Sequence, residues 1–243
     1  MKKVNIDQLN EQFHSASAEA VMAFAVERFG NELTLASSLG LEDQVLTHMY
    51  STLTDQMDIF VLDTGRLHQE TYDVIEKNRT LYAFNYRVFF PKQTSVEAMV
   101  MAHGPNHFYE SVDYRKECCY IRKVEPLQRA LKGYSAWITG IRRAQSIDRT
   151  TTSFFEWDQV NQIVKVNPLI KWSKDDTWDY INRNEIPYNV LHDKGFPSIG
   201  CAPCTRAIEP GEDDRSGRWW WEESVKKECG LHVDLPSKEL GDE

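Results

Sequence analysis

The chain has 243 residues and a formal net charge of −9, with 41% hydrophobic and 27% charged residues. That length and composition suit a globular protein with a sizeable core. The acidic charge argues against a broad nucleic-acid interface, and no apolar run approaches the roughly 20 residues of a membrane helix. The N-terminus lacks the apolar segment of a signal peptide, so we expect a cytoplasmic protein without nucleic-acid or membrane partners.

Short apolar strands alternate with amphipathic helices along the chain. The predicted elements are a helix over 16–29, a strand over 33–38, a helix over 41–52, a strand over 57–63, a helix over 68–80, a strand over 86–90, a helical stretch over 110–132, a strand over 135–140, a hairpin of 154–157 with 162–166, and a helix over 174–184 that begins after Ser173. This alternation is typical of an α/β fold whose mostly parallel sheet carries helices on both faces. We predict one α/β domain over 1–210 and a mobile C-terminal tail over 211–243.

Small or polar residues follow three of the predicted strands. Ligands of such sheets bind where the strands end, and a helix N-terminus after the first strand suits an anion. Each strand exit alone is also compatible with ordinary turn chemistry, but together they indicate a nucleotide-sized anionic ligand. The candidate binding residues are Ser37, Ser38, Gly40, Asp63, Thr64, Arg142 and Arg143.

Five cysteines divide into a group of four and a single residue. Cys118 and Cys119 are adjacent, and Cys201 and Cys204 form a Cys-x-x-Cys pair, which together match the four thiolates of a metal site. Neighbouring residues of a helix point about 100° apart, so adjacent thiolates chelate one ion poorly. This favours a 4Fe-4S cluster, with a zinc site or unrelated core cysteines left open.

Cys229 is the cysteine that remains. It follows two lysines, which favour the thiolate, and Glu228, which opposes it; His232 lies three residues further on. We interpret Cys229 as a reactive nucleophile, against the alternative of a buried, inert thiol. His232 is a candidate for orienting the thiol, or a simple surface histidine. With the other four cysteines as ligands, no resolving cysteine remains, so an outside dithiol protein must complete any thiol chemistry.

The motifs of the chain resemble one family from about Leu33 to His232. They are Ser-Ser-Leu-Gly-Leu-Glu-Asp (37–43), Leu-Asp-Thr-Gly-Arg (62–66), Cys-Cys-Tyr-Ile-Arg-Lys-Val-Glu-Pro-Leu (118–127), Gly-Ile-Arg-Arg-Ala-Gln-Ser (140–146), Cys-Ala-Pro-Cys-Thr-Arg (201–206), Gly-Glu-Asp-Asp-Arg-Ser-Gly-Arg-Trp-Trp-Trp-Glu (211–222) and Glu-Cys-Gly-Leu-His (228–232). The chain is similar to the assimilatory adenylyl-sulfate (APS) reductases of the APS/PAPS reductase family. The first loop departs from the Ser-Gly-Gly-x-Asp-Ser pattern of ATP-cleaving relatives.

The resemblance implies a PP-loop-like adenine nucleotide α-hydrolase fold, with APS as substrate and sulfite and AMP as products. It implies that Cys229 attacks the sulfur, that thioredoxin or a glutaredoxin-like dithiol protein releases the sulfite, and that the four other cysteines hold a 4Fe-4S cluster. Lys123 is then expected to link this cluster to the charge of the substrate. Arg215 and Arg218, with Arg142 or Arg143, are expected to contact phosphate and sulfate.

Other interpretations stay open at this point. PAPS could be the substrate, alone or beside APS, because recognising a 3′-phosphate takes only one or two further cations. An ATP-dependent tRNA-thiolating enzyme and a non-enzymatic metal-binding or electron-transfer module are the alternatives from other classes. The three consecutive tryptophans, 219–221, fit packing better than adenine stacking, and the sequence leaves a homo-oligomer open.

Overall fold

The computed structural model describes residues 4–145 and 152–222. Its helices are α1 (Ile6–Gln12), α2 (Ala18–Phe29), α3 (Leu41–Leu53), α4 (Gln69–Tyr82), α5 (Gln93–His103), α6 (Val112–Cys119), α7 (Glu125–Leu131) and α8 (Lys174–Arg183). Its strands are β1 (Leu33–Ser37), β2 (Ile59–Leu62), β3 (Arg87–Phe89), β4 (Ala136–Ile138), β5 (Phe155–Asp158) and β6 (Ile163–Val166). None of the described helices is long and apolar enough to cross a membrane.

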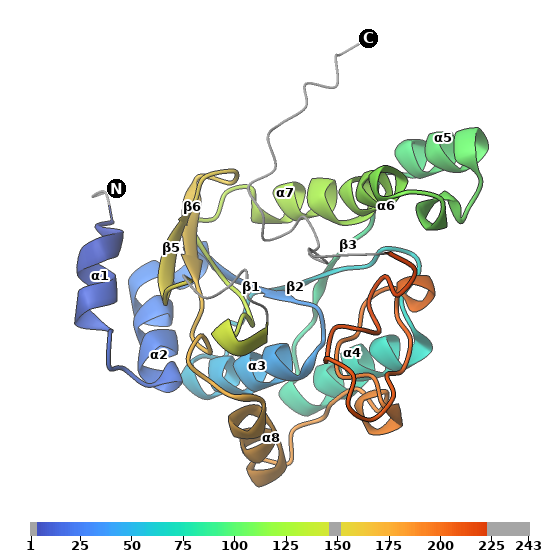
Figure 1. The fold of residues 1–243 in the computed structure, drawn as a ribbon. Helices are drawn as coiled ribbons and strands as arrows, with labels where there is room; N and C mark the ends of the chain where they lie inside the picture. The colour runs from blue at the N-terminus through green and yellow to red at the C-terminus, as the bar shows by residue number, and fades with distance from the viewer. Residues whose placement is uncertain (1–3, 146–151, 223–243) are drawn as a thin grey trace.

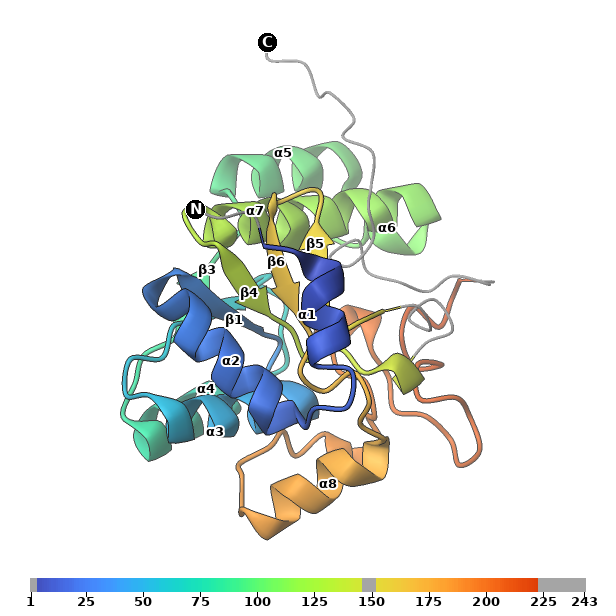
Figure 2. The same ribbon diagram turned by 90° about the vertical axis from the view of Figure 1, so that its left-hand side faces the viewer.

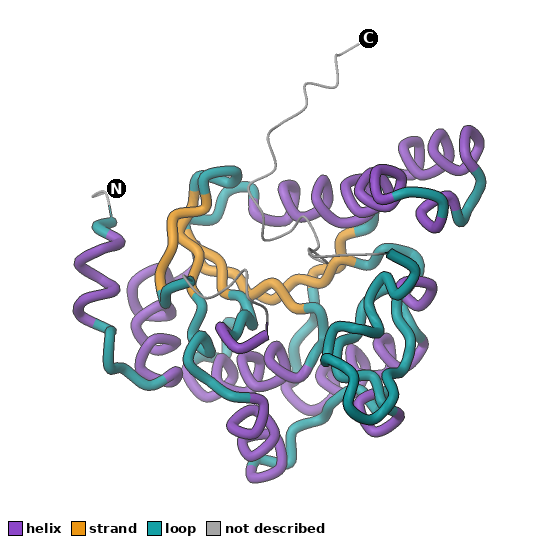
Figure 3. The backbone as a smooth tube through the Cα atoms, viewed as in Figure 1, coloured by secondary structure: helices purple, strands orange, loops and turns teal. Residues whose placement is uncertain are grey.

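The six strands form one sheet in the order β3-β2-β1-β4-β6-β5. Every neighbouring pair is parallel except β5 with β6, which form the predicted antiparallel hairpin. Helices α5, α6 and α7 lie over one face of the sheet, and α2, α3 and α4 lie over the other (Figures 1 and 3). The side view separates the same two layers (Figure 2). The predicted α/β class with helices on both faces is therefore confirmed.

Apolar side chains on both faces of the sheet explain this layering. Leu35 and Ile138 belong to the larger core, which includes residues of α2 and α3. Phe60 and Trp137 belong to a second core, with Leu127 of α7. Because strands buried on both faces take mostly apolar residues, β2 (Ile-Phe-Val-Leu) and β4 (Ala-Trp-Ile) appear in the sequence as short continuous apolar runs rather than as an alternation.

The helices show where local patterns succeed and where they fail. Ser173 forms a capping box with Asp176, so α8 begins where the sequence predicts. The sequence patterns do not predict α1 or α5; α5 buries only Met99 and therefore shows little apolar periodicity. The stretch predicted over 110–132 is not one continuous α-helix, since a π-helical turn over Tyr120–Val124 joins α6 to α7. Such turns are often found at functional sites.

Candidate functional site

A pocket lies where the strand order of the sheet reverses, next to β1. Strand β1 leads to β2 on one side, and its other neighbour is β4. Ligands of open α/β sheets bind at such a switch point, beyond the carboxyl ends of the strands. Here the residues that follow β1 and β4 line a cavity of about 430 Å³, which lies within the range of small-molecule sites.

The first loop is held by hydrogen bonds of its own. The backbone N–H and the hydroxyl of Ser38 both donate to Asp43 Oδ2, at 2.6 and 2.7 Å, and Leu39 N donates to Ser37 Oγ at 3.1 Å. Burial raises the pKa of Asp43 to about 6, although the bonds from Ser38 oppose the rise. Ser37, Ser38 and Gly40 all line the pocket. The polar groups of Ser38 are therefore already engaged in shaping the loop.

The two candidate binding residues after β2, Asp63 and Thr64, have different positions relative to the pocket. Thr64 lines the pocket, whereas Asp63 is not among the lining residues. The Asp63 carboxylate instead accepts hydrogen bonds from Gly65 N at 2.8 Å and from the Tyr72 hydroxyl at 3.0 Å. Asp63 therefore shapes the turn that presents Thr64.

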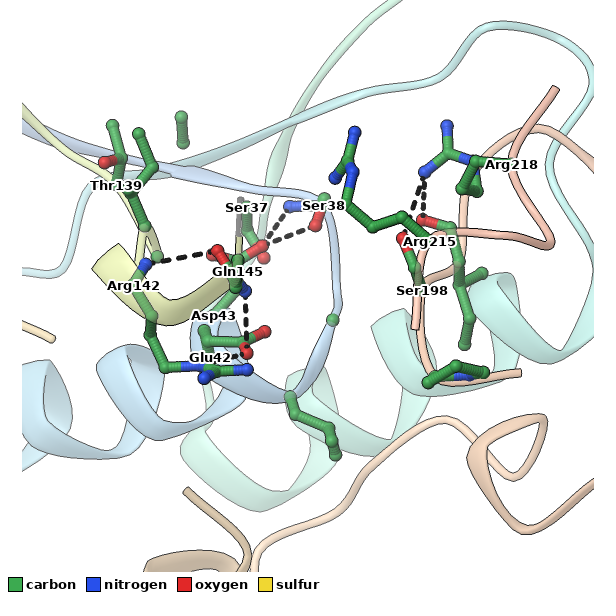
Figure 4. Close-up of a pocket in the computed structure, with 18 of the residues that line it drawn as sticks. Ser37, Ser38, Glu42, Asp43, Thr139, Arg142, Gln145, Ser198, Arg215 and Arg218 are labelled. Atoms are coloured by element: carbon green, nitrogen blue, oxygen red, sulfur yellow. Dashed lines mark hydrogen bonds and ion pairs between the residues drawn. The ribbon is translucent and has the colours of Figure 1, made fainter. Parts of the chain in front are cut away.

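After β4, the two adjacent arginines Arg142 and Arg143 point to different surroundings. Arg142 is buried in the pocket wall, where its Nε donates to Glu42 Oε1 at 2.7 Å, and Gln145 donates to the same oxygen at 2.9 Å (Figure 4). Arg143 is exposed, donates to Thr152 O and does not line the pocket. The charge of Arg142 is thus largely balanced by Glu42, across about a hundred residues of chain.

Arg218 is a buried cation opposite that ion pair (Figure 4). It is 7% exposed, and its hydrogen bonds to described residues are long: 3.4 Å to Ser198 Oγ and 3.5 Å to Ile199 O. Its Nε has no hydrogen-bond partner, and within the described residues Arg218 has no carboxylate partner. An unpaired buried charge costs several kcal/mol. The pocket therefore contains a cation suited to an incoming anion, while Arg215 also lines it.

The four cysteines of the predicted metal site meet in a second, smaller pocket. Cys118 and Cys119 come from the end of α6, and Cys201 and Cys204 from a turn next to the first pocket. Burial raises the pKa of Cys204 to about 12, and Cys201 adds to the rise; burial also raises the pKa of Cys118. Within residues 4–145 and 152–222, no group of three or more His, Cys, Asp or Glu side chains is arranged to hold a metal ion.

Positive side chains surround these thiols. The basic residues in the wall of the cysteine pocket are Arg66, Arg115, Arg122, Lys123 and Arg218. Arg122 is 8% exposed and donates to Thr64 O at 2.6 Å, while its Nε has no hydrogen-bond partner in the part of the chain that the structure describes. Thr64 Oγ1 lies 3.2 Å from Cys201 Sγ. Four thiols within a ring of cations match the donor chemistry of an anionic, thiolate-bound group.

One wall is common to both pockets. Lys123, Arg218 and Trp219 line the substrate-sized pocket and also the cysteine pocket. Lys123 lies in the π-helical turn that follows the cysteines. Cationic side chains are therefore shared by the two sites.

The remaining predicted residues, and two site residues that the sequence motifs did not indicate, are as follows. Cys229 and His232 fall outside the described residues. Trp219 and Trp221 pack with Phe108 and the cysteines, as a packing role predicts. The sequence analysis did not nominate Glu42 or Arg122 as site residues. Arg122 had a detectable signal, because it follows Cys118 by four residues and neighbours Lys123.

Comparisons with known proteins agree with this geometry. The family model of the phosphoadenosine phosphosulfate reductase domain matches residues 32–207. An adenosine 5′-phosphosulfate reductase of Burkholderia cepacia is 49% identical over 88% of this chain and 86% of that protein. The one of Agrobacterium fabrum is 42% identical over 95% of this chain and 92% of that protein.

Solved structures with a similar fold include a reductase of the same family. A phosphoadenylyl-sulfate (PAPS) reductase of Candida auris, in a phosphate complex, superposes with a TM-score of 0.72 at 31% identity, covering 86% of this chain and 98% of that one. An FMN adenylyltransferase of Candida glabrata has a TM-score of 0.56 at 13% identity, over 87% of this chain and 70% of that one. The second likeness concerns the fold alone.

Proposed function

The chain belongs to the phosphoadenosine phosphosulfate reductase family, and from this membership we propose that it reduces adenosine 5′-phosphosulfate (APS) to sulfite and AMP in assimilatory sulfate reduction. The choice of APS follows the names of the similar bacterial relatives. A cytoplasmic location fits, since thiol chemistry needs a reducing compartment.

The main structural support for this proposal is the environment of Arg218. It is a buried cation without a carboxylate partner in the described part of the chain, at the wall between the nucleotide-sized pocket and the cysteine pocket. A guanidinium pairs well with phosphate or sulfate oxygens. APS has both groups, and binding it would supply the missing negative charge. Lys123 in the same wall would add a second positive charge beside the sulfate.

Cys229 is the proposed nucleophile. Its thiolate would attack the sulfur of bound APS, forming the S–S bond of a cysteine S-sulfonate while the S–O bond to AMP breaks and AMP leaves. A thiolate of thioredoxin, or of a glutaredoxin-like protein, would then attack the Cys229 sulfur and expel sulfite. The second thiol of that partner would resolve the mixed disulfide. The partner is thereby oxidised by two electrons, and the sulfate sulfur is reduced by two.

Cys118, Cys119, Cys201 and Cys204 are the proposed ligands of a 4Fe-4S cluster. When bound, the cluster would supply an anionic charge among the surrounding cations and tie α6 to the turn of Cys201 and Cys204. The fit rests on four thiols in one pocket whose wall includes Arg122 and Arg218, each with a buried Nε that has no hydrogen-bond partner within residues 4–145 and 152–222. Thr64 and Arg122 would hold the ligand-bearing segments together around it.

Iron content tests the cluster. Purified anaerobically, the protein should be brown and contain about four irons and four acid-labile sulfides per chain. Replacing Cys201 with Ser should remove most of the iron and the visible absorbance. A colourless protein with one zinc per chain would instead establish the zinc alternative, and elemental analysis distinguishes the two outcomes.

The substrate is tested by comparing kcat/KM for APS and for PAPS with thioredoxin present. We expect APS to be preferred by at least about tenfold, because two pocket cations that could meet a 3′-phosphate are already paired: Arg142 with Glu42, and Lys174 with Asp214. Equal efficiencies would show a dual enzyme, and a preference for PAPS would overturn the assignment. ATP cleavage or tRNA binding without sulfite formation would favour the thiolating alternative.

A further inference from the structure

Trp219 has an unusual backbone for a large side chain. Its φ is 45°, in the left-handed region, and the residue is only 1% exposed. A bulky residue in that conformation is strained, and such strain persists only where surrounding contacts impose it. The contacts here are identifiable: Trp219 N donates to Cys204 O at 3.3 Å, and the side chain packs with Phe108, Cys201 and Cys204.

Two guanidinium groups lie over the indole ring. The Cζ of Arg115 is 4.6 Å from the ring centroid, and that of Arg218 is 4.7 Å away. Cation–π contacts of this kind gain strength when water is excluded, as it is around this buried ring.

Glu222 fixes the first of these guanidiniums. Arg115 Nε and Nη2 donate to the two Glu222 oxygens at 2.8 and 3.0 Å, and both side chains are almost fully buried. A bidentate pair of this kind is geometrically specific. Arg115 is therefore held over Trp219 with its charge balanced.

Among the described residues, Arg218 has no comparable partner. Its contacts with this part of the chain are the indole and two long hydrogen bonds, to Ser198 and Ile199. Gly200 leaves the space that its guanidinium occupies, since a Cβ there would lie 2.3 Å from Arg218 Nη2. Among the described contacts, the indole is the close neighbour able to define the direction of this guanidinium without neutralising it.

We propose that Trp219 is a positioning residue that aims Arg218 at the anionic end of the substrate, with the Arg115–Glu222 pair holding the indole in place. The inference rests on the proposed function, in which Arg218 contacts APS. An aromatic ring suits this task better than a carboxylate, because it orients the guanidinium and leaves its positive charge available to an oxyanion. Arg115 lies on α6 three residues before Cys118, so the same contacts connect the cysteine helix to the substrate pocket.

A double-mutant cycle on APS binding tests the proposal. The affinity is measured by calorimetry in the Cys229→Ser protein, which prevents turnover. We expect Trp219→Leu to weaken APS binding about tenfold and Trp219→Phe, which keeps a smaller ring, about threefold. In an Arg218→Ala background, Trp219→Leu should add less than about twofold. Trp220→Leu is the matched control, a neighbouring tryptophan that is 39% exposed, and should leave the affinity unchanged.

The possible results distinguish a failure of the Arg218–APS contact from a failure of the positioning role of Trp219. If Arg218→Ala alone leaves APS binding unchanged, the contact assumed in the proposed function is wrong. If Arg218→Ala weakens binding but the effect of Trp219→Leu multiplies with it in full, Trp219 acts independently and the positioning role is overturned. The Phe variant keeps the test valid if the Leu variant does not fold, since a ring retained over Arg218 predicts the same non-additivity with a smaller effect.

Discussion

Replacing Cys229 with Ser should abolish sulfite formation from APS, because a serine hydroxyl is far less nucleophilic than a thiolate at neutral pH. We expect turnover with thioredoxin to fall by at least about a thousandfold. The measurement is the initial rate of sulfite release. AMP affinity and iron content should both stay at the wild-type level, since the proposed cluster ligands are other residues.

Mass spectrometry supplies an independent check on the same residue. When the wild-type protein is mixed with APS and no dithiol reductant, a sulfonate should appear on the peptide that contains Cys229. Adding thioredoxin should remove it and release sulfite. His232→Ala serves as a comparison, because it retains the nucleophile and should still accumulate the adduct. A Cys229→Ser protein that still forms sulfite would contradict the assignment.

Replacing Arg218 with Ala should lower kcat/KM for APS by about a hundredfold, because a buried, charge-assisted contact with an oxyanion contributes roughly 1.5–3 kcal/mol. Arg218→Lys should recover only part of the loss, since an ammonium cannot make a bidentate contact. The matched control is Arg206→Ala, which removes an arginine of the same segment that pairs with Glu212 and does not line the pocket. We expect its kcat/KM to stay within about twofold of the wild type.

Stability should change in the opposite direction to activity at this position. Arg218 is buried without a carboxylate partner in the described part of the chain, so its burial costs free energy in the absence of ligand. The Arg218→Ala protein should therefore unfold at an equal or higher temperature than the wild type when no nucleotide is bound. AMP or APS should stabilise the wild type more than the variant. A large drop in unfolding temperature would show that Arg218 serves the fold rather than the ligand.

Local patterns predicted most of the architecture. The strands appear as short apolar runs because the sheet is covered on both faces, and α8 begins at Ser173 because a capping box is encoded within four residues. The prediction was less complete where an element buries little. Helix α5 contributes one buried side chain, Met99, and so leaves a weak periodic signal. The π-helical turn over Tyr120–Val124 lies within a stretch whose local pattern predicts one continuous helix, so the sequence did not reveal it.

For the candidate site, too, the sequence predicted some features and not others. Motifs at the strand exits identified Ser37 and Thr64, and the family resemblance identified Arg218; all three line the pocket. Motifs did not distinguish Asp63 from Thr64, although only Thr64 faces the cavity. The direction of a loop side chain is set by the groups that surround it, such as Tyr72 beside Asp63.

The amino-acid sequence was enough to identify the family, the strands of the sheet, most of the helices, and the division of the cysteines into two pairs and a single residue, because spacing and motifs are properties of the chain alone. Which cations remain available to a ligand depends on the three-dimensional arrangement of the charged side chains. Arg142 is paired with Glu42, whereas Arg218 has no carboxylate partner among the described residues and lies over Trp219. A charge is balanced or left unbalanced by neighbours in space, and here the partner of Arg142 lies a hundred residues away in the chain.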